Sequence, residues 1–366
     1  MTYNNLNFQA GCKTTAMAIM PHTNVEKALD LVLNLDIPFW PQLPNLSFYD
    51  DMYAQASYDF PGVVIDHKDE KIGFNTARFE NEISDYSLKM VAPESFTLNQ
   101  DYAAVYQQFL TKDLQSYPAI HGQISGPVNL GFRINDEDSK PIVYNENVRS
   151  LLFDFIQRKF NAQYQQLQEK NPNAFVWLDE PGLIWVFSGL SGYNDVQARQ
   201  EYLDFLAGLN GLKALHLCSN VNLPYLLELG IDFLSFDAYQ IEVMPVGYAG
   251  SVAKFIKNGG IISWGIVPTE PVSLSKETPE TLVKRLLDYW EVVSHKTGLP
   301  IKQIAEQALI APAKCCVKSL EFSPSDKTVA NGTENNPVLT TEEQSVEKAY
   351  AYLKTLSQIL KSKFGL

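Results

Sequence analysis

Short β-rich runs alternate with longer amphipathic stretches along almost the whole chain, and this alternation constrains the fold more than any other feature. The β-rich runs lie at residues 13–20, 37–42, 117–125, 174–181, 214–220, 233–239, 260–267 and 309–316. Helical patterns lie near residues 24–34, 101–114, 145–170, 194–209, 221–229, 248–258, 276–296 and 341–363. Eight strands that are each followed by a helix are typical of a (β/α)8 barrel. We therefore predict a single TIM-barrel domain over residues 1–366.

Two segments interrupt the alternation. Residues 43–99 form an insertion between the second and third runs, and VVIDHKDEKIGF within it predicts a small hairpin that turns at Lys68–Lys71. The polar stretch 321–340 predicts a loop, and the helix at 341–363, with Thr340 at its N-cap, would close the barrel. A doubly wound sheet in two domains is the rival architecture. It would normally show a Gly-rich phosphate turn after an early strand, and none is visible.

The net charge and the composition limit the classes of partner that this chain could bind. The net charge of −13 argues against nucleic acid or an anionic membrane, because phosphate binding needs a basic face. No stretch approaches the roughly 20 apolar residues of a membrane helix, and the N-terminus lacks a secretory signal, so we expect a cytoplasmic protein. The 4 cysteines are too few for a disulfide framework and favour metal or thiol chemistry. A small molecule or another protein remains as the partner.

The run ALHLCSN places His216 and Cys218 two positions apart. Side chains two apart on a strand share a face, so both can reach one metal ion. Asp237 ends the sixth run, and Cys315 or Cys316 ends the eighth, which would bring N, O and S donors to the mouth of the barrel. Thiolates with an imidazole favour Zn²⁺, and an open fourth position suits catalysis. A packed His-x-Cys pair without metal is the alternative.

Asp179 and Glu180 end the fourth run and form a second candidate. Adjacent residues face opposite sides of a strand, so one carboxylate would point inward. There it would bind a substrate amino group or act as an acid or base. A helix N-cap or a surface salt bridge is the alternative interpretation.

Other polar and aromatic residues are candidates for substrate binding. Gln123 and Ser125, in GQISGPVNLG, offer uncharged hydrogen-bonding groups, although a Gly-Pro turn after a strand is often only a turn. Trp264 and Tyr239 would form apolar walls of the same mouth. Plain core packing explains each of these aromatic residues equally well.

Several stretches, taken in order, match the pattern of a known group of enzymes. They are TTAMAIMPHT, IPFWPQLPNLSFYDDMYAQ, QISGPVNLG, VWLDEPGL, HLCSN, IDFLSFDAY, GGIISWGIVPT and the late cysteine pair. From about residue 13 to residue 320, the chain resembles the catalytic half of cobalamin-independent methionine synthase. It also resembles the wider superfamily that includes uroporphyrinogen decarboxylase and the zinc methyltransferases acting on methylated corrinoids.

The resemblance implies particular residue roles. The Zn²⁺ ligands would be His216, Cys218 and Cys315, with Asp237 where methionine synthase has a glutamate. Cys316 stands where the family has a glycine, so either cysteine of the pair remains a candidate ligand. Two further positions match residues that bind the amino-acid part of homocysteine. Asp179 matches the residue that holds the homocysteine ammonium group, and Ile19 replaces a serine that helps to bind the homocysteine carboxylate.

The resemblance also implies a reaction. Methionine synthase carries an extra barrel for its folate donor, for which 366 residues leave no room, so the chain is similar to the short "core" methionine synthases. The expected reaction is methyl transfer from methylcobalamin, or from a methylcorrinoid bound to a partner protein, to homocysteine. Three alternatives stay open: another acceptor such as a coenzyme thiol, a decarboxylase similar to uroporphyrinogen decarboxylase, and a non-catalytic protein that binds corrinoid or zinc.

Overall fold

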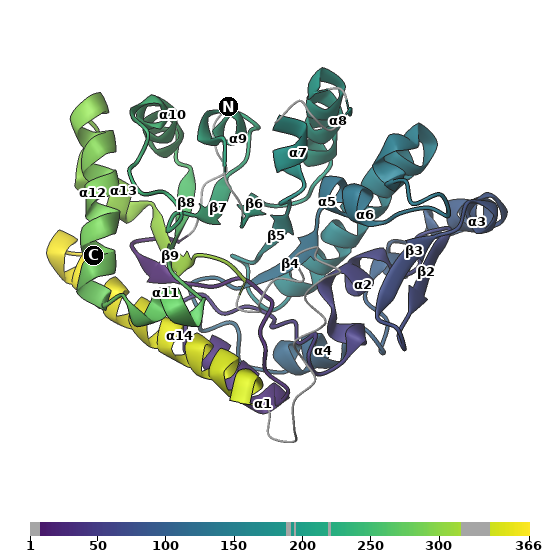
Figure 1. Cartoon of the computed structure of the whole chain (residues 1–366), viewed down its shortest axis with the longest axis horizontal. Helices are drawn as coiled ribbons and strands as arrows, with labels where there is room; N and C mark the ends of the chain where they lie inside the picture. Colours follow the sequence, from purple (N-terminus) through teal and green to yellow (C-terminus); the bar gives the residue numbers. More distant parts are fainter. Residues whose placement is uncertain (1–7, 188–191, 194, 219–220, 316–336) are drawn as a thin grey trace.

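A curled parallel sheet lies at the centre of the molecule (Figure 1). The computed structural model describes residues 8–187, 192–193, 195–218, 221–315 and 337–366. Within these residues the sheet has seven strands in the spatial order β1-β9-β8-β7-β6-β5-β4, and every neighbouring pair is parallel. The strands are β1 (Lys13–Thr14), β4 (His121–Ser125), β5 (Phe175–Asp179), β6 (Lys213–Leu217), β7 (Phe233–Asp237), β8 (Ile261–Val267) and β9 (Ala308–Pro312).

Residues 37–42, which we predicted as the second strand, join the two edges of this sheet without forming a regular strand. Isolated parallel bridges pair Phe39 with His121 of β4, and Gln42 with Ile19, which follows β1. The two prolines of the run IPFWPQ explain the irregularity, because proline has no backbone N–H to donate to a ladder. The fold is thus α/β, and among the described residues its central sheet has seven regular strands, one fewer than predicted.

Helices surround the sheet on its outer side (Figure 1). The helical segments that the sequence predicts are all present, as α1 (Val25–Leu33), α4 (Ala104–Leu110), α6 (Glu146–Gln168), α8 (Asp195–Ala207), α9 (Leu223–Leu227), α10 (Val246–Lys257), α12 (Pro279–Thr297) and α14 (Pro337–Phe364). Helices that we did not predict are α2 (Met52–Ser57), α3 (Thr76–Lys89), α5 (Pro127–Arg133), α7 (Leu183–Phe187), α11 (Pro271–Ser275) and α13 (Ile301–Glu306). Among the described residues, none of the helices combines the length and apolar character that crossing a bilayer requires.

The closing helix α14 begins earlier than predicted. It starts at Pro337, where the missing N–H of proline costs nothing, so Thr340 lies inside the helix and not at its N-cap. Its apolar stripe, which includes Val346, Leu353 and Leu360, is buried, and the helix contacts β1, β9 and α12. Residues 321–336 of the predicted polar loop lie outside the described residues.

The insertion at residues 43–99 contains the predicted hairpin and more. Strands β2 (Val63–Asp66) and β3 (Lys71–Phe74) pair antiparallel, and α3 follows them. The insertion also holds α2 and the short 3-10 helices η1 (Phe48–Asp50) and η2 (Pro93–Phe96); a third, η3 (Ile142–Tyr144), precedes α6. Helix α2 contacts β4, which brings the insertion against the central sheet.

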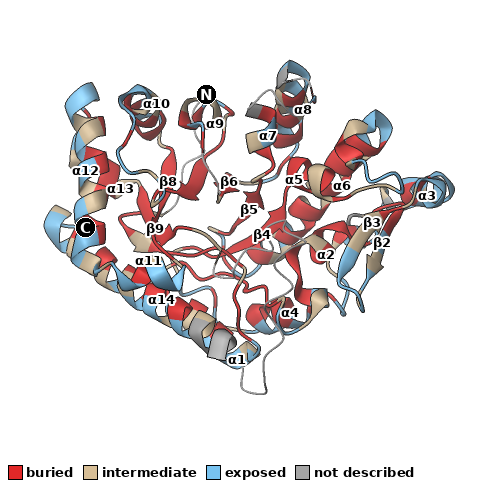
Figure 2. Cartoon of the chain, in the orientation of Figure 1, coloured by how far each residue is buried: buried red, intermediate tan, exposed pale blue. Residues whose placement is uncertain are grey.

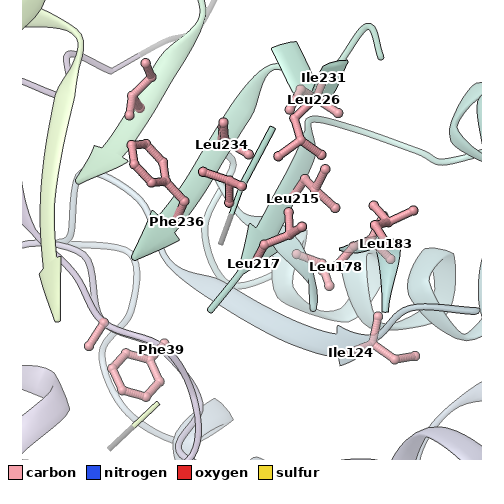
Figure 3. Close-up of a cluster of buried hydrophobic side chains, with 14 of the residues drawn as sticks. Phe39, Ile124, Leu178, Leu183, Leu215, Leu217, Leu226, Ile231, Leu234 and Phe236 are labelled. Carbon is pink, nitrogen blue, oxygen red and sulfur yellow. The ribbon is translucent and has the colours of Figure 1, made fainter. Parts of the chain in front are cut away.

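Strand side chains alternate between two apolar clusters, and Figure 2 shows the buried centre that results. One cluster lies between the strands and helices and includes Leu178, Leu215, Leu217, Leu234 and Phe236 (Figure 3). The other consists of alternate strand residues toward the amino ends of the strands, including Phe175, Trp177, Phe233, Ile261 and Leu309. Burial of one such large side chain contributes about 1.5–3 kcal/mol. Further along the strands, the positions that continue this second, inner series are polar, and they carry the candidate site.

Candidate metal centre

A belt of small and ionisable side chains crosses five neighbouring strands. In the strand register Asp179 is aligned with Ser125 on one side and His216 on the other, and Ser235 is aligned with His216 and Ser263. All five residues are buried. Buried polar groups need partners, because loss of water is otherwise uncompensated. Asp179, His216 and Ser263 each have a buried side-chain atom without a hydrogen-bond partner in the described structure.

Three donor groups meet at this belt. A carboxylate oxygen of Asp179, a ring nitrogen of His216 and the sulfur of Cys218 all lie within 4.8 Å of one another. His216 Nε2 lies 3.9 Å from Asp179 Oδ1, and neither atom has a hydrogen-bond partner among the described residues. Imidazole, thiolate and carboxylate are the donors that bind Zn²⁺ in proteins. The three side chains thus have the donor types that bind zinc, and two of their donor atoms lack a hydrogen-bond partner in the described structure.

The other ring nitrogen of His216 is held in place. Nδ1 lies 2.9 Å from the hydroxyl oxygen of Ser235. With a proton on Nδ1, the ring donates to this oxygen and keeps the Nε2 lone pair free on the side of Asp179. Metal-ligating histidines usually have such a partner on the second nitrogen.

Burial and mutual charge shift the pKa values in the cluster. Burial, reinforced by the charge of Cys218 and opposed by that of His216, raises the pKa of Asp179 to about 7. Burial alone would lower the pKa of His216, but the Cys218 thiolate and the Asp179 carboxylate raise it overall. A hydrogen bond from Cys315 holds the pKa of Cys218 well below its usual value; burial opposes this effect and His216 reinforces it. The thiolate form of Cys218, which is the form that binds metals, is therefore favoured.

The remaining predicted metal ligands lie in different places. Cys315 reaches the sulfur of Cys218 but is not part of the cluster of three donors. Asp237 is also near Cys218, yet its carboxylate accepts hydrogen bonds from the backbone N–H of Gln240, at 3.1 Å, and from the Gln240 side chain. Cys316 lies outside the described residues.

The polar residues predicted to bind substrate are engaged in local contacts. Gln123 Nε2 donates to the carbonyl of Trp40 at 2.8 Å, while its Oε1 is buried without a partner in the described structure. Ser125 accepts a hydrogen bond from Asn129 Nδ2 at 2.9 Å. Ile19 is partly buried beside Gln42 at the edge of the sheet.

The two predicted aromatic walls do not form part of the cluster. Trp264 is fully buried and packs against Phe236 and Trp290, on the side of the sheet that faces the helices. Its neighbours in β8 occupy the alternate, inner positions, so the assignment of Trp264 to the mouth was wrong. The Tyr239 hydroxyl donates to Glu277 at 2.9 Å.

Asp179 and Glu180, which are adjacent in the sequence, lie in different surroundings. Asp179 joins the cluster, whereas the buried Glu180 accepts hydrogen bonds from the backbone N–H groups of Val128, at 3.2 Å, and Asn129, at 2.7 Å, in the first turn of α5. Gly126 permits this approach, because a Cβ there would lie 2.1 Å from a Glu180 carboxylate oxygen. Glu180 is thus neither an N-cap residue nor part of a surface salt bridge: it is buried and binds the first turn of α5, whose N-cap is Gly126, while Asp179 lies in the cluster.

Two residues near the cluster were not found by sequence reasoning. Ser235 follows the same period of two that places Phe233 and Asp237 on the inner face, so strand alternation alone could have found it. Tyr53 of α2 lies within electrostatic range of Asp179 and Cys315. It comes from the insertion, and no local sequence pattern indicates where α2 docks.

Comparison with known proteins does not assign the chain to a family. No model of a known family matches the sequence, and neither does any curated protein. Among solved structures it is similar to a B12-independent methionine synthase from Shewanella sp. W3-18-1 in complex with selenomethionine, with 13% sequence identity and a TM-score of 0.43. The match covers 71% of this chain and 66% of that chain.

Proposed function

We propose that this chain is a zinc-dependent methyltransferase that transfers a methyl group to the sulfur of a small thiol, with homocysteine as the acceptor. The observation that supports this most is the buried cluster of Asp179, His216 and Cys218. Two of its donor atoms, Asp179 Oδ1 and His216 Nε2, have no hydrogen-bond partner among the described residues. A buried polar atom without a partner costs about 1–3 kcal/mol, and a bound ion and substrate would provide partners for both atoms.

We assign the metal to His216, Cys218 and Cys315, because an imidazole and two thiols are the donors that favour Zn²⁺ over harder cations. The contact between the sulfur atoms of Cys315 and Cys218 supports this set. Bound Zn²⁺ stabilises the thiolate form of the acceptor at neutral pH, where a free thiol of pKa near 8.5 is mostly protonated. Ser235 holds the His216 ring by its second nitrogen.

Asp179 then faces the acceptor and not the metal. Its carboxylate lies beside His216, in a buried position where a negative charge needs a cationic partner. The ammonium group of an amino-acid thiol supplies that partner. With sulfur and ammonium both fixed, orientation of the acceptor contributes to the rate.

For the methyl donor we propose a methylated corrinoid, free or bound to a protein, as the sequence resemblance implies. The acceptor sulfur forms a bond to the methyl carbon, and the bond between methyl and donor breaks with its electron pair left on the donor. The proton of the acceptor thiol passes to solvent. The described residues supply the acceptor half of this reaction.

The test is an anaerobic assay of the zinc-loaded protein with homocysteine and either methylcobalamin or methyltetrahydrofolate. We expect methionine to form together with loss of the methylcobalamin spectrum. Cys218→Ser should abolish both activity and zinc binding. Cys12→Ala is the matched control, because Cys12 is a buried cysteine next to the amino end of β1 and donates to the carbonyl of Ala305. Stoichiometric zinc without methylation of any thiol would contradict the proposal.

A further inference from the structure

The backbone ladder between residues 37–42 and β4 ends early. Among the residues that the structure describes, His121 makes two backbone hydrogen bonds with this run, of 3.1 and 3.3 Å. Further along the run, Pro41 has no N–H to donate, and the N–H of Gln42 donates to the carbonyl of Ala18 on the other side, at 2.8 Å. Beyond His121, the seam between the run and β4 is therefore not closed by backbone hydrogen bonds.

Carboxamide side chains bridge this seam. Gln123 Nε2 donates to the carbonyl of Trp40 at 2.8 Å, and Gln163 Nε2, from α6, donates to the carbonyl of Gln123 at 3.3 Å. Gln42 Nε2 donates to Gln55 Oε1 at 2.6 Å. Each amide nitrogen is thus used, whereas Oε1 of Gln42, Gln123 and Gln163 is buried without a hydrogen-bond partner in the described structure. Three acceptors are left for a further group.

A cavity of about 20 Å³ lies at the seam. The three glutamines line it together with Trp40 and Tyr106, whose rings lie 4.6 Å apart. Trp40 Nε1 and the Tyr106 hydroxyl are also buried and have no partner among the described residues. A cavity needs roughly 10–15 Å³ to hold one water molecule, and a buried water needs two to four polar partners. The cavity meets both conditions.

The chemistry of the wall disfavours an ion. Among the described residues, no aspartate or glutamate lines the cavity, and the Lys159 ammonium at its wall donates to the carbonyls of Gln55 and Tyr58, at 2.8 and 3.2 Å. A second cation would be repelled by this ammonium and could not accept from Trp40 Nε1. Three carboxamide oxygens would repel an anion in turn. The group that fits is neutral and both donates and accepts.

We propose that one water molecule occupies this cavity and joins residues 37–42 to β4 and α6. Water donates two hydrogen bonds and accepts two, so a single molecule can bind two of the carboxamide oxygens, Trp40 Nε1 and the Tyr106 hydroxyl. It would replace the backbone bonds that are missing beyond His121 and hold the irregular second strand against the central sheet. This inference does not depend on the proposed function.

A crystal structure of the whole chain at a resolution of about 1.5 Å tests the site. We expect a water oxygen about 2.6–3.2 Å from Trp40 Nε1 and from at least two of the three carboxamide oxygens. A second crystal, soaked in rubidium chloride, distinguishes a monovalent cation, because rubidium gives an anomalous signal. A cavity without density, or a rubidium peak inside it, overturns the proposal.

Removal of one polar partner tests the water site in solution. Tyr106→Phe should lower the melting temperature by about 1–2 °C, because a hydrogen bond to the water is lost. Tyr202→Phe is the matched control, since the Tyr202 hydroxyl is also buried without a partner in the described structure but does not line this cavity. Its melting temperature should stay the same or rise. The same change in both variants overturns the water site.

Discussion

His216 Nδ1 lies 2.9 Å from the hydroxyl oxygen of Ser235, and the opposite nitrogen of the same ring faces Asp179 Oδ1 at 3.9 Å. The ring is therefore fixed on one side by a neutral hydrogen bond and left unsatisfied on the other. Such a contact sets both the tautomer and the direction of a metal ligand.

Loss of the Ser235 hydroxyl should weaken zinc binding. We expect Ser235→Ala to lower zinc affinity about 10- to 100-fold, the range seen when the outer partner of a ligating histidine is removed. Competition with a chromogenic chelator measures it. Ser263→Ala is the control, because Ser263 belongs to the same belt but its hydroxyl has no partner in the described structure. Equal zinc affinities in the two variants would show that Ser235 does not orient His216.

Replacement of the Asp179 carboxylate distinguishes a role in binding the acceptor from a role in binding the metal. Asp179→Asn should retain zinc and weaken homocysteine binding at least about tenfold, because an amide offers no charge to the ammonium group. Zinc content by mass spectrometry and homocysteine affinity by calorimetry are the two measurements. Loss of zinc from this variant would move Asp179 into the ligand set and refute its assignment to the acceptor.

Asp50 should make the protein less stable as pH rises. It is buried in η1, its Oδ1 has no partner in the described structure, and burial raises its pKa to about 7 from 3.8. Between these pH values the folded state binds more protons than the unfolded chain, so the free energy of unfolding falls with rising pH.

Asp50→Asn should lessen this trend and stabilise the protein at pH 8 by roughly 2–4 kcal/mol. Urea unfolding at pH 5 and pH 8 measures it, with the exposed Asp69→Asn as the control. An identical pH dependence in the Asp50 variant and the unmodified protein would contradict the prediction.

Gly126 should be sensitive to a single added methyl group. A Cβ at this position would lie within 2.4 Å of three Glu180 side-chain atoms, so Gly126→Ala should lower the free energy of unfolding by about 1–3 kcal/mol. Gly250→Ala, in the exposed part of α10 with open space around it, should instead be neutral or stabilise by up to about 1 kcal/mol. Thermal unfolding of both variants tests the contrast, and a Gly126 variant as stable as the Gly250 one would contradict it.

The period-two and helical patterns of the sequence predict most of the sheet and its inner face, and the failures have physical causes. The inward direction of the His216 and Asp179 side chains could be predicted, because the alternation of side chains along a strand depends only on the local sequence. Asp237 is also on the inner face, but Gln240 three residues later holds its carboxylate, a contact that the strand pattern does not reveal. The prediction that Trp264 lines the mouth rests on its large aromatic side chain. In the alternation of β8, however, this side chain points toward the helices, where it packs against Trp290.

Other features depend on contacts between distant segments. The irregular second strand follows from two prolines, which have no N–H group to donate to the neighbouring strands. Helix α2, which carries Tyr53, docks against β4, far away along the chain. The Tyr53 ring then meets Arg133, which lies in a helix that the sequence pattern did not predict. Tertiary packing of this kind has no local periodicity to reveal it.

Zinc X-ray absorption, recorded before and after addition of homocysteine, tests the central claim most directly. We predict that the protein binds one zinc ion with a nitrogen and sulfur environment at Zn–S distances of about 2.3 Å, and that homocysteine adds one sulfur to it. The same protein carrying Cys218→Ser should show no specific zinc site. A sulfur number that does not change with homocysteine, or a zinc environment of oxygen alone, would contradict a metal centre that activates a thiol.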